Sequence, residues 1–245
     1  GTTFHGEVYL EPRESVPEDL TKRIVFTDGS VEGTTGGAAA WRRDTNQNVT
    51  FQVFSPSSST ECEMVGLISG LALDPQLMVT DSLTALHWIG SWGKKSSKET
   101  LACQNRNLVR QFIAEAKSRN AQDHPIALLK VKAHDKAAIE RGAVLSEGNE
   151  KADILAKLAV SCGRGWTPDP KFDDPVTLMC EGKPLTKMRI QWKLWSKSKT
   201  KVTDHAERGW GGCYPRRLTG SCRMRVFASH LQDNRDLYTK PPQPR

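Results

Sequence analysis

Hydrophobic and polar positions alternate along the first part of the chain in the manner of β-strands. Three short runs rich in β-branched, aromatic or small apolar residues lie at residues 23–27, 36–42 and 49–54. Turn-forming residues separate them, and the first run ends at Asp28, which Gly and Ser follow. Three short strands joined by turns predict an antiparallel meander.

The spacing of apolar residues changes after the Ser-rich stretch at 55–60. Met64, Leu67, Ile68 and Leu71 recur at helical spacing, which predicts a helix. The two residues before Glu61 are Ser59 and Thr60, which are typical N-caps, so we expect the helix to begin there.

The rest of the first 160 residues predicts two more strands and three more helices. The expected strands are residues 76–80 and 126–132, and the expected helices are residues 82–92, 105–121 and 149–160. The order βββαβααβα predicts an α/β domain with a mixed five-stranded sheet, three antiparallel strands followed by parallel ones, flanked by helices.

Acidic residues stand at the edges of four of these segments. Asp28 and Asp81 each follow an apolar strand, Glu63 lies in a first helical turn, and Asp153 lies in the first turns of the last helix. A carboxylate beside a core needs charge compensation, which a divalent cation supplies. Any one of these acids alone is more often a cap or turn residue. If they converge at one rim of the sheet, the four predict a site for Mg²⁺ or Mn²⁺.

Five short motifs occur in the order found in the ribonuclease H family, which residues 23–160 resemble. They are TDGS at 27–30, the helix start at Glu63, TDS at 80–82, VKAH at 131–134 and GNEKAD at 148–153. The resemblance implies an endoribonuclease that hydrolyses the RNA strand of RNA–DNA hybrids with two Mg²⁺ ions, for which Mn²⁺ can substitute. The products would carry a 5′-phosphate and a 3′-hydroxyl.

The resemblance also implies roles for five residues. Asp28, Glu63, Asp81 and Asp153 would be metal ligands, and His134 would assist proton transfer or product release. A lone His at a strand end is more often structural, and the downstream GNEKAD motif favours the catalytic interpretation. The stretch between His134 and this motif is longer than in the family, so residues 135–147 are expected to form a short helix or a mobile flap.

Two glutamates compete for one metal position. The family's acid is followed by small residues three and seven positions later and by an apolar residue at the eighth. Counting from Glu63 meets Gly66, Gly70 and Leu71, whereas counting from Glu61 does not. The pattern therefore selects Glu63.

Contacts to the hybrid are implied at short polar residues and at a basic segment. RNA is told from DNA by its 2′-hydroxyls, through backbone amides and short polar side chains in the minor groove. The corresponding positions here are Gly29, Ser30, Ser59, Thr60, Ser82, Lys94, Lys95 and Asn149. Lys98 continues the basic segment.

Charge is distributed unevenly along the chain. The first 160 residues carry 18 Lys and Arg against 20 Asp and Glu, whereas residues 161–245 carry 17 against 8. The basic part favours nucleic acid as a partner, with a solvated, disordered tail as the alternative. Within residues 187–202, cationic residues interleave with Trp192 and Trp195. This pattern predicts either contacts to phosphates and bases or an amphipathic helix docked on the core.

We expect three parts: a flexible lead-in at 1–20, a ribonuclease H-like catalytic domain at 21–162, and a basic Trp-containing extension at 163–245. The chain begins with Gly rather than Met, which favours a fragment or a processed piece. The arrangement resembles the ribonuclease H domain of a non-LTR retrotransposon polyprotein, which implies an attached or associated reverse transcriptase.

Cysteine usage and hydropathy limit the cellular context. The six cysteines form no CxxC pair, and neither a secretion signal nor an apolar stretch of membrane-spanning length is present. These features predict an intracellular location, nucleus or cytoplasm, without a membrane partner. In the extension, His205, Cys213, Cys222 and His230 are spaced too widely for a compact zinc knuckle, so zinc is not expected.

Two other functions are compatible with such a fold. A non-catalytic module that binds RNA or hybrids is expected to lack at least one of the four acids. A DNA nuclease or integrase is expected to lack the set of DGS, TDS and His–GNEKAD motifs. All of these are present, so the hybrid nuclease is the favoured prediction.

Overall fold

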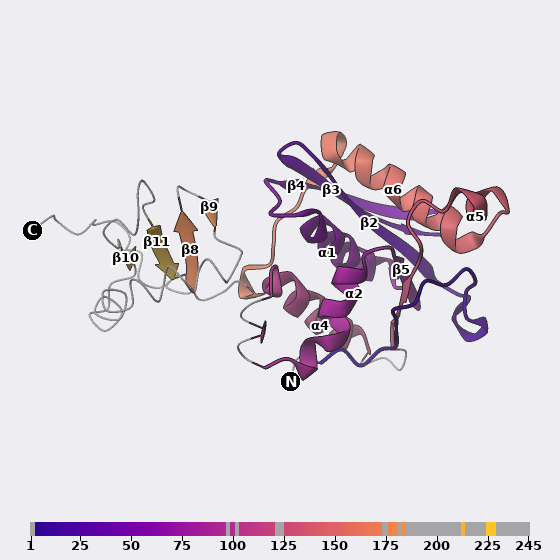
Figure 1. The fold of residues 1–245 in the computed structure, drawn as a ribbon, viewed down its shortest axis with the longest axis horizontal. Helices are drawn as coiled ribbons and strands as arrows, with labels where there is room; N and C mark the ends of the chain where they lie inside the picture. The colour runs from indigo at the N-terminus through magenta and orange to yellow at the C-terminus, as the bar shows by residue number, and fades with distance from the viewer. Residues whose placement is uncertain are drawn as a thin grey trace, which may run out of the picture. The chain divides into compact units, whose positions relative to one another are not determined.

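The computed structural model describes residues 3–96, 99–100, 103–120, 125–172, 176–180, 183–184, 212–213 and 224–228 (Figure 1). The chain divides into two compact units, one made of residues 1–96 and 105–169 and the other of residues 97–104 and 170–245. Each unit has its own sheet. Among the described helices, none is long and apolar enough to cross a membrane.

A seven-stranded mixed sheet forms the centre of the first unit, in the order β1-β6-β5-β2-β3-β4-β7. The strands are β1 (Val8–Tyr9), β2 (Ile24–Glu32), β3 (Thr35–Arg42), β4 (Gln47–Phe54), β5 (Leu77–Thr80), β6 (Ala127–Lys130) and β7 (Arg164–Gly165). Strands β2, β3 and β4 are antiparallel, and β5 and β6 run parallel to β2. The predicted mixed α/β fold is confirmed, with two short edge strands added to the five expected.

Tight turns join the three antiparallel strands. Gly33, at φ 60°, lies in the turn between β2 and β3, and Asn46, at φ 54°, lies in the turn between β3 and β4. Gly and Asn tolerate this left-handed conformation better than other residues. The residues at these two turns therefore suit the backbone conformation that the meander requires.

Helices cover both faces of this sheet (Figure 1). They are α1 (Ser59–Gly70), α2 (Leu83–Ser91), α4 (Arg106–Asn120), α5 (Lys136–Glu140) and α6 (Val144–Cys162), with short 3-10 turns η1 (Glu18–Leu20), η2 (Leu71–Leu73) and η3 (Trp92–Lys94). A Cβ added at Gly70 of α1 would meet Val25, whereas one added at Gly148 of α6 would meet Phe26. Successive strand residues point to opposite faces, so α1 and α6 lie on opposite sides of β2.

Two helix starts differ from the predictions. Ser58, rather than Ser59 or Thr60, is the N-cap of α1, and its side chain makes no capping bond. Helix α6 begins at Val144 instead of residue 149, and α5 occupies part of the remaining insert. Asp153 therefore lies in the middle of α6, where its backbone is held by hydrogen bonds on both sides.

The segment expected as a flexible lead-in is bound to the sheet. Strand β1 pairs in parallel with β6, and the Arg13 amide donates to the Lys130 carbonyl at 3.1 Å. Tyr9, Val16 and Leu20 pack against the core cluster on the α6 side of the sheet. An edge strand offers unpaired backbone groups, and a two-residue partner is too short to show any alternation in sequence.

The second unit contains a four-stranded antiparallel sheet in the order β10-β11-β8-β9. Its elements are η4 (Pro170–Phe172), β8 (Val176–Cys180), β9 (Lys183–Pro184), β10 (Gly212–Cys213) and β11 (Met224–Ala228). Residues 187–202, with Trp192 and Trp195, lie outside the described residues, as do Lys98, His205, Cys222 and His230. The predictions for these residues stay predictions.

Candidate active site

Three acidic side chains meet at one rim of the first sheet. Asp28 lies on β2, Asp81 directly follows β5, and Glu63 lies on α1. Each offers a carboxylate oxygen, and these oxygens lie within 4.8 Å of one another. Contrary to expectation, β2 does not end at Asp28 but continues to Glu32. The rim forms because the β2–β5 pairing stops after Phe26, beside Val79.

Two glycines allow α1 to lie close enough to β2 for Glu63 to reach Asp28. A Cβ at Gly29 would lie 2.4 Å from the Glu63 amide nitrogen, and a Cβ at Gly66 would lie 2.8 Å from the Asp28 carbonyl oxygen. No real side chain tolerates such contacts without moving the backbone. The requirement for small residues at these positions is therefore a packing requirement of the acid cluster.

The structure separates the two competing glutamates. Glu63 is 9% exposed, and its Oε2 has no hydrogen-bond partner among the described residues. Glu61 instead accepts hydrogen bonds from the Ser57 amide, at 2.6 Å, and the Ser57 hydroxyl, at 2.7 Å. Glu63 is thus the glutamate that lies beside Asp28 and Asp81.

Burial makes the ionised form of the cluster costly. It raises the pKa of Asp28 to about 7, the charge of Asp81 adds to the rise, and the hydrogen bond from the Gly29 amide opposes it. The pKa of Glu63 is raised well above its ordinary value by burial and then by the charges of Asp28 and Asp81. Like charges in a low-dielectric site cannot all be ionised without a counter-charge.

The cluster fits a divalent cation of the Mg²⁺ type. All of its donors are carboxylate oxygens, which hard cations prefer. The buried, unpartnered Oε2 of Glu63 points to a missing partner, because buried polar atoms are nearly always satisfied. A cation would satisfy that atom and compensate the charge in one step.

The fourth predicted acid, Asp153, lies next to this cluster rather than inside it. It is 6% exposed, and its charge contributes to the raised pKa of Asp28. Its Oδ2 accepts a hydrogen bond from Lys157 at 2.6 Å. Gly148 brings α6 close to the sheet, since a Cβ there would lie 2.2 Å from the Phe26 ring. Asp153 therefore faces the rim from α6.

Asn149, one turn before Asp153, links α6 to the cluster. Its Nδ2 donates to Asp81 Oδ2 at 3.3 Å, and its side chain is buried. This hydrogen bond connects Asn149 to Asp81, and the predicted contact of Asn149 with the substrate stays a prediction. Its Oδ1 has no partner among the described residues.

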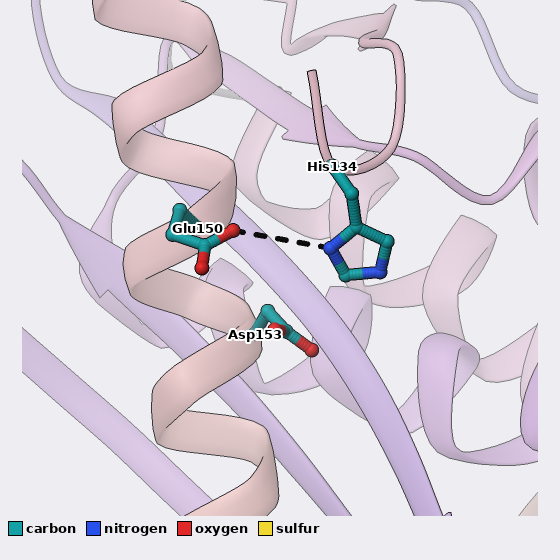
Figure 2. Close-up of side chains that lie close together, drawn as sticks. All are labelled: His134, Glu150 and Asp153. Atoms are coloured by element: carbon teal, nitrogen blue, oxygen red, sulfur yellow. Dashed lines mark ion pairs between the residues drawn. The ribbon is translucent and has the colours of Figure 1, made fainter. Parts of the chain in front are cut away.

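His134 belongs to a second group of possible metal ligands, with Glu150 and Asp153 (Figure 2). Its Nδ1 lies 3.9 Å from Glu150 Oε2. The His134 backbone has φ 49°, an uncommon conformation outside glycine. The prediction missed Glu150, although it lies three residues before Asp153 and thus on the same face of α6.

The other predicted contact residues lie at or near the surface. Ser30 on β2, Thr60 on α1 and Lys95 after η3 are half-buried, and Ser59 and Lys94 are exposed. The Ser82 hydroxyl accepts a hydrogen bond from the Ala85 amide at 3.4 Å and so caps the start of α2. The predicted contacts of these residues with a substrate stay predictions.

Comparison with known proteins supports the resemblance seen in the motifs. The family model described as RNase H matches residues 21–161. A search of curated proteins finds no match to this chain.

Proposed function

Because the chain belongs to the ribonuclease H family, we propose that it is an endoribonuclease that hydrolyses the RNA strand of RNA–DNA hybrids. The observation that carries the proposal is the buried cluster of Asp28, Glu63 and Asp81, whose oxygens lie within 4.8 Å of one another. Family membership supports a nuclease activity. The cluster supplies the carboxylate ligands that a metal-dependent nuclease requires.

Four residues would hold two Mg²⁺ or Mn²⁺ ions: Asp28, Glu63, Asp81 and Asp153. Two such ions would neutralise the carboxylates, activate a water molecule and stabilise the attacking and leaving oxygens of the phosphodiester. The expected products are a 5′-phosphate and a 3′-hydroxyl.

The remaining residues of the site would position these ligands or move protons. Asn149 orients Asp81 through its hydrogen bond, and Lys157 orients Asp153 through its ion pair. His134 is largely exposed and lies beside Asp153, a location suited to proton transfer to solvent or to release of the product.

We also propose that eight residues contact the hybrid: Gly29, Ser30, Ser59, Thr60, Ser82, Lys94, Lys95 and Asn149. The basic composition of residues 161–245 supports further contacts to phosphates. The same arrangement supports a role in a retroelement, where the enzyme would remove template RNA in association with a reverse transcriptase.

A cleavage assay tests this function. A labelled RNA–DNA hybrid is incubated with the full chain and Mg²⁺, and Asp81→Asn is compared with Glu61→Gln as a matched control outside the cluster. We expect Asp81→Asn to lower kcat about a thousand-fold or more, and Glu61→Gln to retain activity. A wild type that binds hybrid without cleaving it would show a non-catalytic module, and equal activity of Asp81→Asn and wild type would contradict the site.

A further inference from the structure

Lys130 is a half-buried cation to which the proposed mechanism gives no role. It is the last residue of β6, and its backbone lies beside Thr80 of β5, the residue before Asp81. Its neighbour Leu129 packs in the core cluster on the α6 side of the sheet. Because successive strand residues point to opposite faces, the Lys130 side chain lies on the α1 side, from which Glu63 reaches the rim.

The charges of the acid cluster act on this lysine. Burial lowers the pKa of Lys130 below its ordinary value, whereas the charges of Asp81 and Glu63 oppose that fall. The ammonium donates a hydrogen bond to the Val131 carbonyl, which holds the nitrogen at the end of β6. An ammonium has three donors, so this bond does not exhaust it. A cation held beside carboxylates that repel one another offsets part of their repulsion.

A second lysine near the site lies in a different environment. Lys157 of α6 is paired with Asp153, and 60% of its side chain is exposed. Solvent screens an exposed charge of this kind, so it contributes little at a distance. Lys130 is half-buried, so its charge acts on the cluster through a medium of lower dielectric constant. Lys130 is therefore the better placed of the two to change the electrostatic potential at Asp81 and Glu63.

We propose that Lys130 is a positioning residue of the acid cluster, whose positive charge stabilises the carboxylates in the metal-free protein and limits the affinity of the cluster for Mg²⁺. The ammonium repels an incoming dication, so the cluster binds Mg²⁺ less tightly than its carboxylates alone would. Lys130 thereby sets the Mg²⁺ concentration at which the site is filled. This role rests on the metal site of the proposed function.

The sign of the expected effect separates this role from a structural one. Removing the ammonium makes the potential at the cluster more negative, which attracts Mg²⁺ and protons alike. A dication gains twice as much from that change as a single proton that it displaces, so Mg²⁺ binding should become tighter. Damage to the packing around β6 would instead make Mg²⁺ binding weaker.

Calorimetric titration of the full chain with MgCl₂ at pH 8 tests the role. Lys130→Gln and Lys130→Met remove the charge, and Lys130→Arg keeps it. Lys117→Gln is a matched control, because it removes the same charge from an exposed position on α4. We expect the two neutral variants to bind Mg²⁺ about ten-fold more tightly than wild type, and the other two to stay within about two-fold of it. Equal or weaker binding by neutral variants whose circular dichroism matches that of wild type would overturn the role.

A cleavage assay over a range of Mg²⁺ concentrations distinguishes this role from the proposed function. We expect Lys130→Gln to reach half of its maximal rate on the labelled hybrid at about ten-fold lower Mg²⁺ concentration than wild type. Tighter Mg²⁺ binding by the neutral variants without cleavage by any protein would contradict the nuclease and support the role of Lys130. Cleavage by wild type with unchanged Mg²⁺ binding in the neutral variants would support the nuclease and overturn the role of Lys130.

Discussion

Replacing Asp28 by Asn should make the metal-free protein more stable while abolishing cleavage. The amide keeps an oxygen to accept the Gly29 amide, which lies 2.8 Å from Asp28 Oδ1. Its NH₂ group can donate to Glu63, which offers a carboxylate oxygen within 4.8 Å of one of Asp28. The substitution therefore removes a buried charge while retaining the volume and most of the hydrogen bonding.

The size of the gain follows from the pKa of Asp28. Burial and Asp81 raise it from 3.8 to about 7, and a ten-fold change in proton affinity corresponds to about 1.4 kcal/mol. The ionised carboxylate thus costs the folded state up to about 4 kcal/mol above pH 7. Because the pKa is higher in the folded state, the cost is absent below about pH 4 and grows as the pH rises to 7.

Urea unfolding in EDTA measures this difference. We expect the variant's free energy of unfolding to exceed that of the wild type most at pH 8 and to approach it near pH 4. Adding Mg²⁺ should raise the wild-type stability more than that of the variant, since ligand binding to the folded state stabilises it. Glu61→Gln should change stability by less than about 1 kcal/mol at either pH. A gain that is absent at pH 8, or equal at both pH values, would refute the reasoning.

Two further predictions concern the packing that places the site. Gly148→Ala introduces a Cβ 2.2 Å from the Phe26 ring, so we expect the free energy of unfolding, measured in urea, to fall by about 1–3 kcal/mol. Lys151 is exposed on the same helix, so Lys151→Ala should lower that free energy by less than about 0.5 kcal/mol. Equal losses for the two variants would contradict the prediction. Deleting residues 1–20 removes Tyr9, Val16 and Leu20 from the core, so we expect the free energy of unfolding to fall by about 3 kcal/mol or more. An unchanged unfolding midpoint would show that the segment does not stabilise the sheet.

The parts of the fold that could be predicted are those governed by local patterns. The meander of β2, β3 and β4 follows from apolar runs separated by turn residues, and its turns use Gly33 and Asn46 at positive φ. The helical spacing after residue 60 likewise predicts most of α1. Strand pairs with tight turns and amphipathic helices are specified within short windows of sequence.

Edge pairing and helix starts could not be predicted in this way. Strand β1 forms because β6 offers an unpaired edge. Its pairing partner lies 120 residues away in the chain, and a two-residue segment is too short to show the alternation that identifies a strand. Helix α6 begins five residues early because Gly148 packs on Phe26, which holds residues of modest helix propensity in the helix. Tertiary packing overrides local propensity at both places.

The sequence by itself determined which acids are present, in which order, and which sheet they flank. Only the tertiary structure decided that Asp28, Glu63 and Asp81 lie together and that Glu150 faces His134. The physical reason is that a motif specifies residue types, whereas burial and the distances between charges depend on segments that are distant in the chain. Burial, and then the nearby charge of Asp81, raises the pKa of Asp28 and makes a counter-ion necessary.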